Sequence, residues 1–325
     1  MRIALVLLLL SSLVCQAGEV RPAFGEADAP TEFPNVSLLI ETPKLAELLT
    51  PPKGTAPAKF VIIDARPKDE FQAARIPGAR SIESDPFQDA NRPPTFLPAP
   101  ESVEGVASRC GIDPDTLVII YDNHGGRLAA RLWFTFYAYG HEKLAILQGG
   151  YAKWRGEQRN IEAGVPPPVE KPGTWKPAET LRGVVSSAEL PKFFVPAAEG
   201  TVPPTTIIDA RDYAEYMGLD VRSKWGGHVP HAANYPWESS MKTADLGAKG
   251  AEKQEFLVWK EPSEIHALLR AACVVPKSPL VVYDQSGGRA AHLMFTLHLM
   301  GYTHAVCYYG GWREYGNLPS PEIEK

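Results

Sequence analysis

The chain has 325 residues, of which 44% are apolar, and a formal net charge of −5. This length and composition suit two domains with ordinary hydrophobic cores. The charge is too small for a nucleic-acid-binding protein, and no dense run of lysine and arginine occurs. We expect a monomer without a cofactor, whose ligand is a small molecule or another protein.

The first residues have the pattern of a signal peptide. Arg2 precedes an almost wholly apolar run over residues 3–14, which is too short to span a membrane comfortably. Cys15 and Ala17 are small residues at the two positions that signal peptidase inspects. We therefore predict a signal peptide over residues 1–17, cleavage near Ala17, export to a periplasm or the cell exterior, and no membrane span. Acylation of Cys15 is the alternative, and the bulky Val14 argues against it.

Residues 18–34 form an N-terminal extension, and residues 35–164 are the first predicted domain. An apolar segment ending in Asp64-Ala65-Arg66 predicts a strand whose aspartate caps the next turn. A second apolar run, residues 117–120, leads through a Gly-rich loop into a helical pattern over residues 128–139. This first loop contains Asp122, Asn123, His124, Gly125, Gly126 and Arg127.

A proline-rich linker over residues 165–180 separates the first domain from residues 181–325, where the same motifs return. The strand and turn at 62–66 recur at 207–211. The second Gly-rich loop follows Tyr283 and contains Asp284, Gln285, Ser286, Gly287, Gly288 and Arg289. The chain is therefore a tandem duplication, and the second copy is enlarged over residues 212–262.

A loop of this kind suits an anion, because a strand that turns through glycines into a helix points its backbone N–H groups inward. The helix dipole adds positive potential, and a cysteine at the head of the loop would ionise readily. The three cysteines beyond the signal peptide, Cys110, Cys273 and Cys307, do not occupy such a position. We expect all three to be small buried residues.

These motifs, together with Ile76-Pro77, Val229-Pro230 and the sequence over residues 148–154, resemble the tandem rhodaneses, the thiosulfate and 3-mercaptopyruvate sulfurtransferases. The resemblance covers about residues 35–318. It implies an α/β fold of two tandem domains, each with a parallel sheet flanked by helices. It also implies that the second loop should open with a cysteine that carries sulfane sulfur as a persulfide, whereas the first commonly carries a silent aspartate.

Two residues depart from that pattern. Asp284 stands at the cysteine position, and Glu215 stands where active tandem members place a substrate-binding arginine. Glu215 and Arg289 are therefore the candidate ligand-binding residues, and no catalytic residue is assigned. Each loop arginine, Arg127 or Arg289, either pins its own loop or binds a ligand. His292 and His298 lack the spacing of a zinc site, so no metal is expected.

Three functions remain open. The first is an exported binding or scaffold protein that has lost sulfur transfer in both loops. The second is a sulfurtransferase that retains the activity of its family. The third is an enzyme that uses Asp284 as a nucleophile or general base. The reversed charge at residue 215 and the missing thiol favour the first function.

Overall fold

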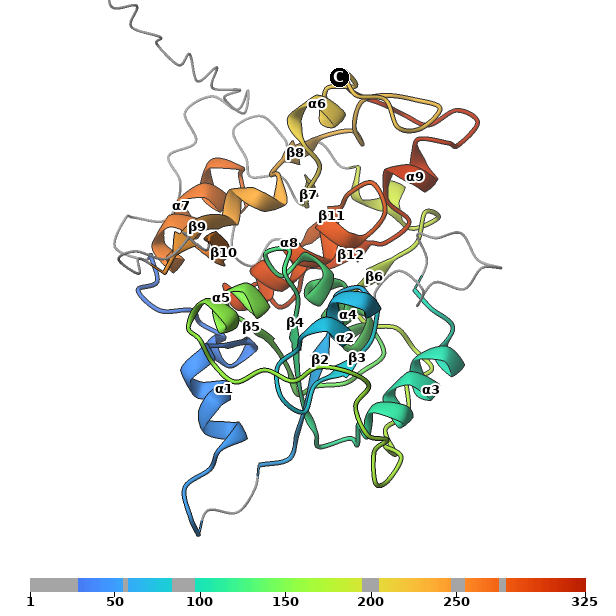
Figure 1. Ribbon diagram of the computed structural model, residues 1–325. Helices are drawn as coiled ribbons and strands as arrows, with labels where there is room; N and C mark the ends of the chain where they lie inside the picture. Colours follow the sequence, from blue (N-terminus) through green and yellow to red (C-terminus); the bar gives the residue numbers. More distant parts are fainter. Residues whose placement is uncertain (1–28, 55–57, 84–96, 195–204, 247–254, 275–278) are drawn as a thin grey trace, which may run out of the picture.

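The computed structural model describes residues 29–54, 58–83, 97–194, 205–246, 255–274 and 279–325. Two five-stranded parallel sheets with the same strand order dominate it (Figure 1). Their orders are β1-β5-β4-β2-β3 and β6-β12-β11-β7-β8. This confirms the expected α/β fold of two tandem domains. The predicted signal peptide and its cleavage site lie outside the described residues.

The first sheet is covered by helices on both faces. Alternate side chains of its central strands enter different cores, so Ile63 and Ile120 pack with α3 and α4, whereas Ile62 and Ile119 pack with α1, α2 and α5. The elements are β1 (Leu39–Ile40), α1 (Thr42–Leu49), β2 (Phe60–Asp64), α2 (Lys68–Ala73), β3 (Arg80–Ser81), α3 (Pro100–Cys110), β4 (Leu117–Tyr121), α4 (Arg127–Ala138), β5 (Leu144–Leu147) and α5 (Gly150–Gly156).

The second sheet repeats this arrangement. Ile208 and Val282 face the core that contains α7 and α8, and Ile207 and Val281 face the core that contains α6 and α9. The elements are β6 (Val184–Val185), β7 (Thr206–Asp209), α6 (Tyr213–Tyr216), β8 (Ala232–Asn234), α7 (Pro262–Ala271), β11 (Leu280–Tyr283), α8 (Gly288–Leu299), β12 (Val306–Tyr308) and α9 (Gly311–Tyr315). Short 3₁₀ turns lie at Val36–Leu38, Leu190–Phe193 and Trp237–Ser240.

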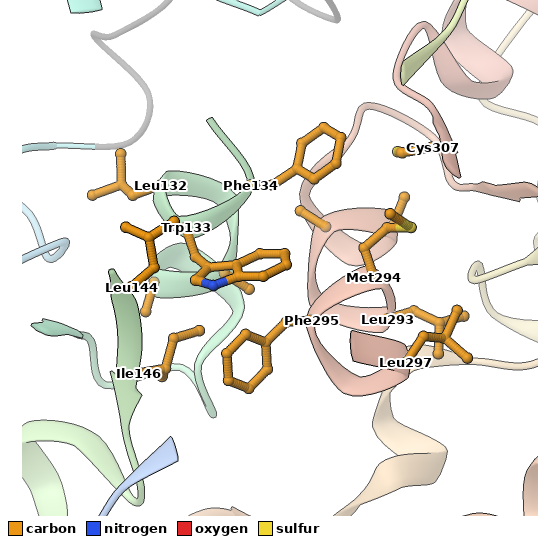
Figure 2. Close-up of a cluster of buried hydrophobic side chains, with 14 of the residues drawn as sticks. Leu132, Trp133, Phe134, Leu144, Ile146, Leu293, Met294, Phe295, Leu297 and Cys307 are labelled. Carbon is orange, nitrogen blue, oxygen red and sulfur yellow. The ribbon is translucent and has the colours of Figure 1, made fainter. Parts of the chain in front are cut away.

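Helices α4 and α8 join the two domains through one continuous core (Figure 2). The Trp133 and Phe295 rings meet edge to face with centroids 5.2 Å apart, and Phe134 stacks on Tyr309 at 5.3 Å. Each helix follows one of the Gly-rich loops. The contact between α4 and α8 therefore fixes the two loops relative to each other.

The enlarged part of the second domain contains a two-stranded antiparallel hairpin, β9 (Met241–Asp245) and β10 (Glu255–Trp259). Strand β10 also contacts α5 of the first domain, and the Trp259 backbone N–H donates to Gln148 Oε1 at 3.2 Å. No helix in the described part of the chain combines the length and apolar character that a membrane crossing needs.

Candidate functional site

The second loop lies at the carboxyl end of the second sheet, between β11 and α8. Asp284 follows the last residue of β11 directly, and its side chain is only 2% exposed. Gly287 adopts φ = +96°, and a β-carbon there would lie 2.9 Å from the Tyr309 ring. Glycine is therefore required at this turn for both its backbone conformation and the close approach of a ring.

The Asp284 carboxylate itself occupies the centre of the loop. Its Oδ1 accepts hydrogen bonds from the backbone N–H groups of Ser286, at 3.0 Å, and Gly287. Its Oδ2 accepts one from the Arg289 backbone N–H at 2.8 Å. The inward-pointing N–H groups that the sequence predicts are thus present, and a side chain of the same loop uses them.

Arg289 pairs mainly with Glu215 and only secondarily with its own loop aspartate. Its Nη1 and Nη2 donate to the two Glu215 carboxylate oxygens at 2.5 and 3.0 Å, whereas its Nε lies 3.8 Å from Asp284 Oδ2. Burial alone would raise the Glu215 pKa, but the hydrogen bonds and charge of Arg289 outweigh it, and the pKa is lowered. Glu215 is therefore an ionised carboxylate, 1% exposed, in a bidentate ion pair.

Acidic groups outnumber basic groups around Arg289. Its Nη1 lies 3.6 Å from the exposed Asp212, in addition to Glu215 and Asp284. The only other cation within 4 Å of Glu215, among the described residues, is the half-exposed Arg222 at 3.6 Å, which also pairs with Asp220. Asp284 and Glu215 thus converge on one guanidinium, that of Arg289.

The remaining second-loop residues hold the loop in place. The Gln285 side chain donates to Ser223 Oγ at 3.3 Å, and its backbone carbonyl accepts the Arg313 N–H at 3.0 Å. Ser286 contributes its backbone N–H to Asp284, as described above, and Gly288 begins α8. None of these three residues borders any of the four cavities described for the protein.

The first loop is filled in the same way. Asp122 is 1% exposed, and its carboxylate accepts four backbone N–H groups at 2.7–3.0 Å. The donors are His124, Gly126, Leu128 and Ala129. Both loops therefore use an aspartate to bind their own amides.

The second domain covers the first loop. A β-carbon on Gly125 would lie 2.9 Å from the Leu257 side chain, and one on Gly126 would lie 2.5 Å from the Trp259 ring. His292 of α8 stacks on Trp259 and makes a 3.1 Å hydrogen bond to the Gly125 carbonyl oxygen. No motif in the sequence predicts this contact. The one relevant feature of the sequence is the enlargement of the second copy over residues 212–262, and the length of an insertion does not determine which surface it packs against.

The edge of the first loop is more open. Asn123 donates to Glu70 at 3.2 Å, and both border a cavity of about 240 Å³ together with Arg66 and Tyr151. His124 is exposed beside them. Glu70 stands six residues after Asp64, as Glu215 does after Asp209. Sequence comparison of the two copies could have found this pair.

The two loop arginines have different surroundings. The Arg127 guanidinium forms no ion pair with any residue that the structure describes, and Arg289 forms three. Burial and the charge of Asp212 raise the pKa of Glu238, and both loop arginines oppose that rise. The charges of Arg127 and Arg289 therefore both reach Glu238. The Arg289 guanidinium makes its closest contact with Glu215 and not with the aspartate of its own loop.

The buried thiols of Cys110 and Cys307 are not poised for reaction. Burial raises the pKa of the Cys110 thiol to about 11, and burial, followed by the charge of Asp284, raises that of Cys307 well above its ordinary value. Cys273 is partly exposed, at the end of α7, in contrast to the expected burial. In the described segments, no group of three or more His, Cys, Asp or Glu side chains could hold a metal ion.

The chain belongs to the rhodanese family, since the model of the rhodanese-like domain matches residues 45–157 and 197–318. It is 26% identical over 302 residues to a thiosulfate sulfurtransferase of Pseudomonas aeruginosa, covering 90% of this chain and 98% of the relative. It is 28% identical over 303 residues to the human 3-mercaptopyruvate sulfurtransferase, covering 87% and 93%.

Solved structures show the same fold. The anaerobic ergothioneine biosynthesis enzyme from Chlorobium limicola, in complex with trimethyl histidine, superposes with a TM-score of 0.73 at 20% identity. The match covers 90% of this chain and 71% of that enzyme. The family assignment from the sequence motifs is confirmed.

Proposed function

We propose that this protein is an exported member of the rhodanese family that binds a ligand or partner and does not transfer sulfur. One observation carries the proposal: the Asp284 carboxylate accepts three backbone N–H groups of its own loop. In the tandem rhodaneses that the sequence resembles, this position holds the persulfide-forming cysteine. Here a carboxylate, which has no sulfur to carry, takes the donors that would stabilise a thiolate or a substrate anion.

The charge around the loop supports the same proposal. A substrate anion would need a cation, and Arg289 is already engaged by both carboxylate oxygens of Glu215. Thiosulfate would also approach a region with three acidic side chains near that arginine. Like charges at a partly buried place repel strongly, so the entry of a dianion would be unfavourable.

The two alternative functions meet physical obstacles. The names of the relatives favour a sulfurtransferase, but the buried Cys307 and Cys110 hold their protons strongly. An Asp284 nucleophile or general base would need to reach a substrate, and both of its oxygens already accept hydrogen bonds in a buried setting. A binding role needs no such rearrangement.

The test is sulfur transfer from thiosulfate and from 3-mercaptopyruvate to cyanide, with the Pseudomonas aeruginosa relative as positive control. We expect no turnover above background and no cyanide-labile sulfur on the protein. Turnover similar to that of the control, lost in Cys307→Ser or Cys273→Ser, would overturn the proposal. Export is tested separately, by N-terminal sequencing of the protein from the extracytoplasmic fraction, where we expect the chain to begin near residue 18.

A further inference from the structure

A cavity of about 410 Å³ lies where α4, α8, the start of the first domain and Arg182, at the start of the second domain, meet. We call it the junction cavity. Its lining includes His298, ten residues beyond the start of α8, which corresponds to about 15 Å along the helix from the second loop. The junction cavity is therefore separate from both Gly-rich loops.

Three aromatic rings form one wall. Trp133 and Tyr137 stack with centroids 5.1 Å apart, and His298 meets both rings edge to face at 5.3 and 4.8 Å. Leu38 and Leu144 add apolar surface. A wall of this composition suits a flat, largely apolar molecule.

Two nitrogen atoms in this wall lack hydrogen-bond partners. Trp133 is 1% exposed and His298 is 5% exposed, and neither Trp133 Nε1 nor His298 Nε2 has a partner. Burial lowers the pKa of His298 to about 4, so its ring is neutral near pH 7. Both nitrogen atoms are themselves enclosed by protein, so they offer no hydrogen bond to a molecule in the cavity, and the wall acts as apolar surface.

Arg182 supplies a cation at the same cavity. Its Nε and Nη2 donate to the carbonyl oxygens of Tyr137, at 2.6 Å, and His141, at 2.9 Å, and its guanidinium carbon lies 4.1 Å from the Tyr137 ring centre. These contacts hold the group in one orientation, and no carboxylate of the described chain pairs with it. Glu142 lines the exposed edge, which disfavours a ligand of high negative charge.

We propose that the junction cavity binds a small organic monocarboxylate with a planar apolar body. The carboxylate pairs with Arg182, and the body lies against the aromatic wall. This inference is independent of the proposed function, because it uses no residue of either Gly-rich loop.

The test follows the Trp133 indole N–H resonance of the ¹⁵N-labelled protein, assigned with Trp133→Phe, during titration with benzoate. We expect a saturable shift, and at least about tenfold weaker binding of benzamide, which has the same shape without the charge. Arg182→Gln should weaken benzoate binding by about tenfold or more, and Arg182→Lys by less.

Thr303→Trp, at an exposed position on the lining, should block binding without disturbing the fold. Lys44→Gln, which removes an exposed positive charge of α1 away from the cavity, should leave binding unchanged. The proposal is wrong if about 10 mM benzoate does not move the resonance. It is equally wrong if benzamide binds as well as benzoate, or if a folded Thr303→Trp variant binds benzoate normally. An equal loss of binding in Lys44→Gln would also contradict it, since binding would then depend on net charge and not on Arg182.

Discussion

Replacing Asp284 by cysteine should create a reactive thiolate that transfers sulfur poorly. The substitution frees the N–H groups of Ser286, Gly287 and Arg289, which now bind the carboxylate. A thiolate at this helix start should therefore have a pKa lowered from about 8.5 by roughly 1–3 units. Glu215, however, remains ionised on Arg289 and faces any incoming thiosulfate.

The size of that repulsion follows from the geometry. Glu215 and Asp284 contact one guanidinium, so a substrate at residue 284 would lie roughly 6 Å from the Glu215 charge. At an effective dielectric constant of about 20, two unit charges at this distance repel by about 3 kcal/mol. Removing that charge should raise kcat/KM for thiosulfate by about 100-fold. We therefore expect Asp284→Cys/Glu215→Gln to exceed Asp284→Cys by this factor.

The variant Asp284→Cys/Glu215→Arg adds attraction and should be more active still, provided that the extra cation beside Arg289 does not unfold it. The matched control is Asp122→Cys, which makes the same change in the loop covered by Leu257 and Trp259 and should stay inactive. Thiocyanate production and pH-dependent alkylation are measured together. Equal activity of the single and double variants, with a reactive thiol in both, would refute the electrostatic argument.

Three further outcomes are expected. Glu215→Gln should lower the unfolding free energy by about 2–4 kcal/mol by breaking the buried pair with Arg289. The pKa of Glu215 is lowered in the folded protein, so its ionised form stabilises the fold above the unfolded pKa of about 4.3, and this stabilisation is lost as pH falls through the folded pKa. The unfolding free energies of the original protein and the Glu215→Gln variant, measured by denaturant titration from pH 7 to pH 3, should therefore converge as pH falls. A constant difference between the two proteins over this range would exclude this role. Gly126→Ala should lower the melting temperature more than Gly54→Ala does. Both glycines have φ near +90°, but only a β-carbon at Gly126 would meet the Trp259 ring. Equal decreases in melting temperature would show that the ring moves away. Sulfate and thiosulfate should not raise the melting temperature through the second loop, whereas divalent cations or amines should, and sulfate stabilisation that is lost in Arg289→Ala would contradict the assigned charge balance.

The sequence alone determined the features that depend on neighbouring residues in the chain. The two apolar runs before Asp122 and Asp284, the glycines after them and the helical patterns that follow specify strand, turn and helix locally. The duplication itself predicted two domains, each with a parallel sheet, and the structure shows that both sheets have the same strand order. The sequence could also have predicted that Glu215 and Asp284 lie close together, because each follows the end of a parallel strand and the carboxyl ends of parallel strands meet at one edge of a sheet.

Only the tertiary structure decided which groups pair. It placed Arg289 on Glu215 in preference to its own loop aspartate, laid β10 over the first loop, and opened the junction cavity beside Arg182. The first two of these contacts join residues 74 to 133 positions apart in the chain, and the contacts between the domains accompany the packing of α4 against α8. No periodicity or motif encodes such contacts, because the free energy that selects them comes from burying side chains of distant segments together.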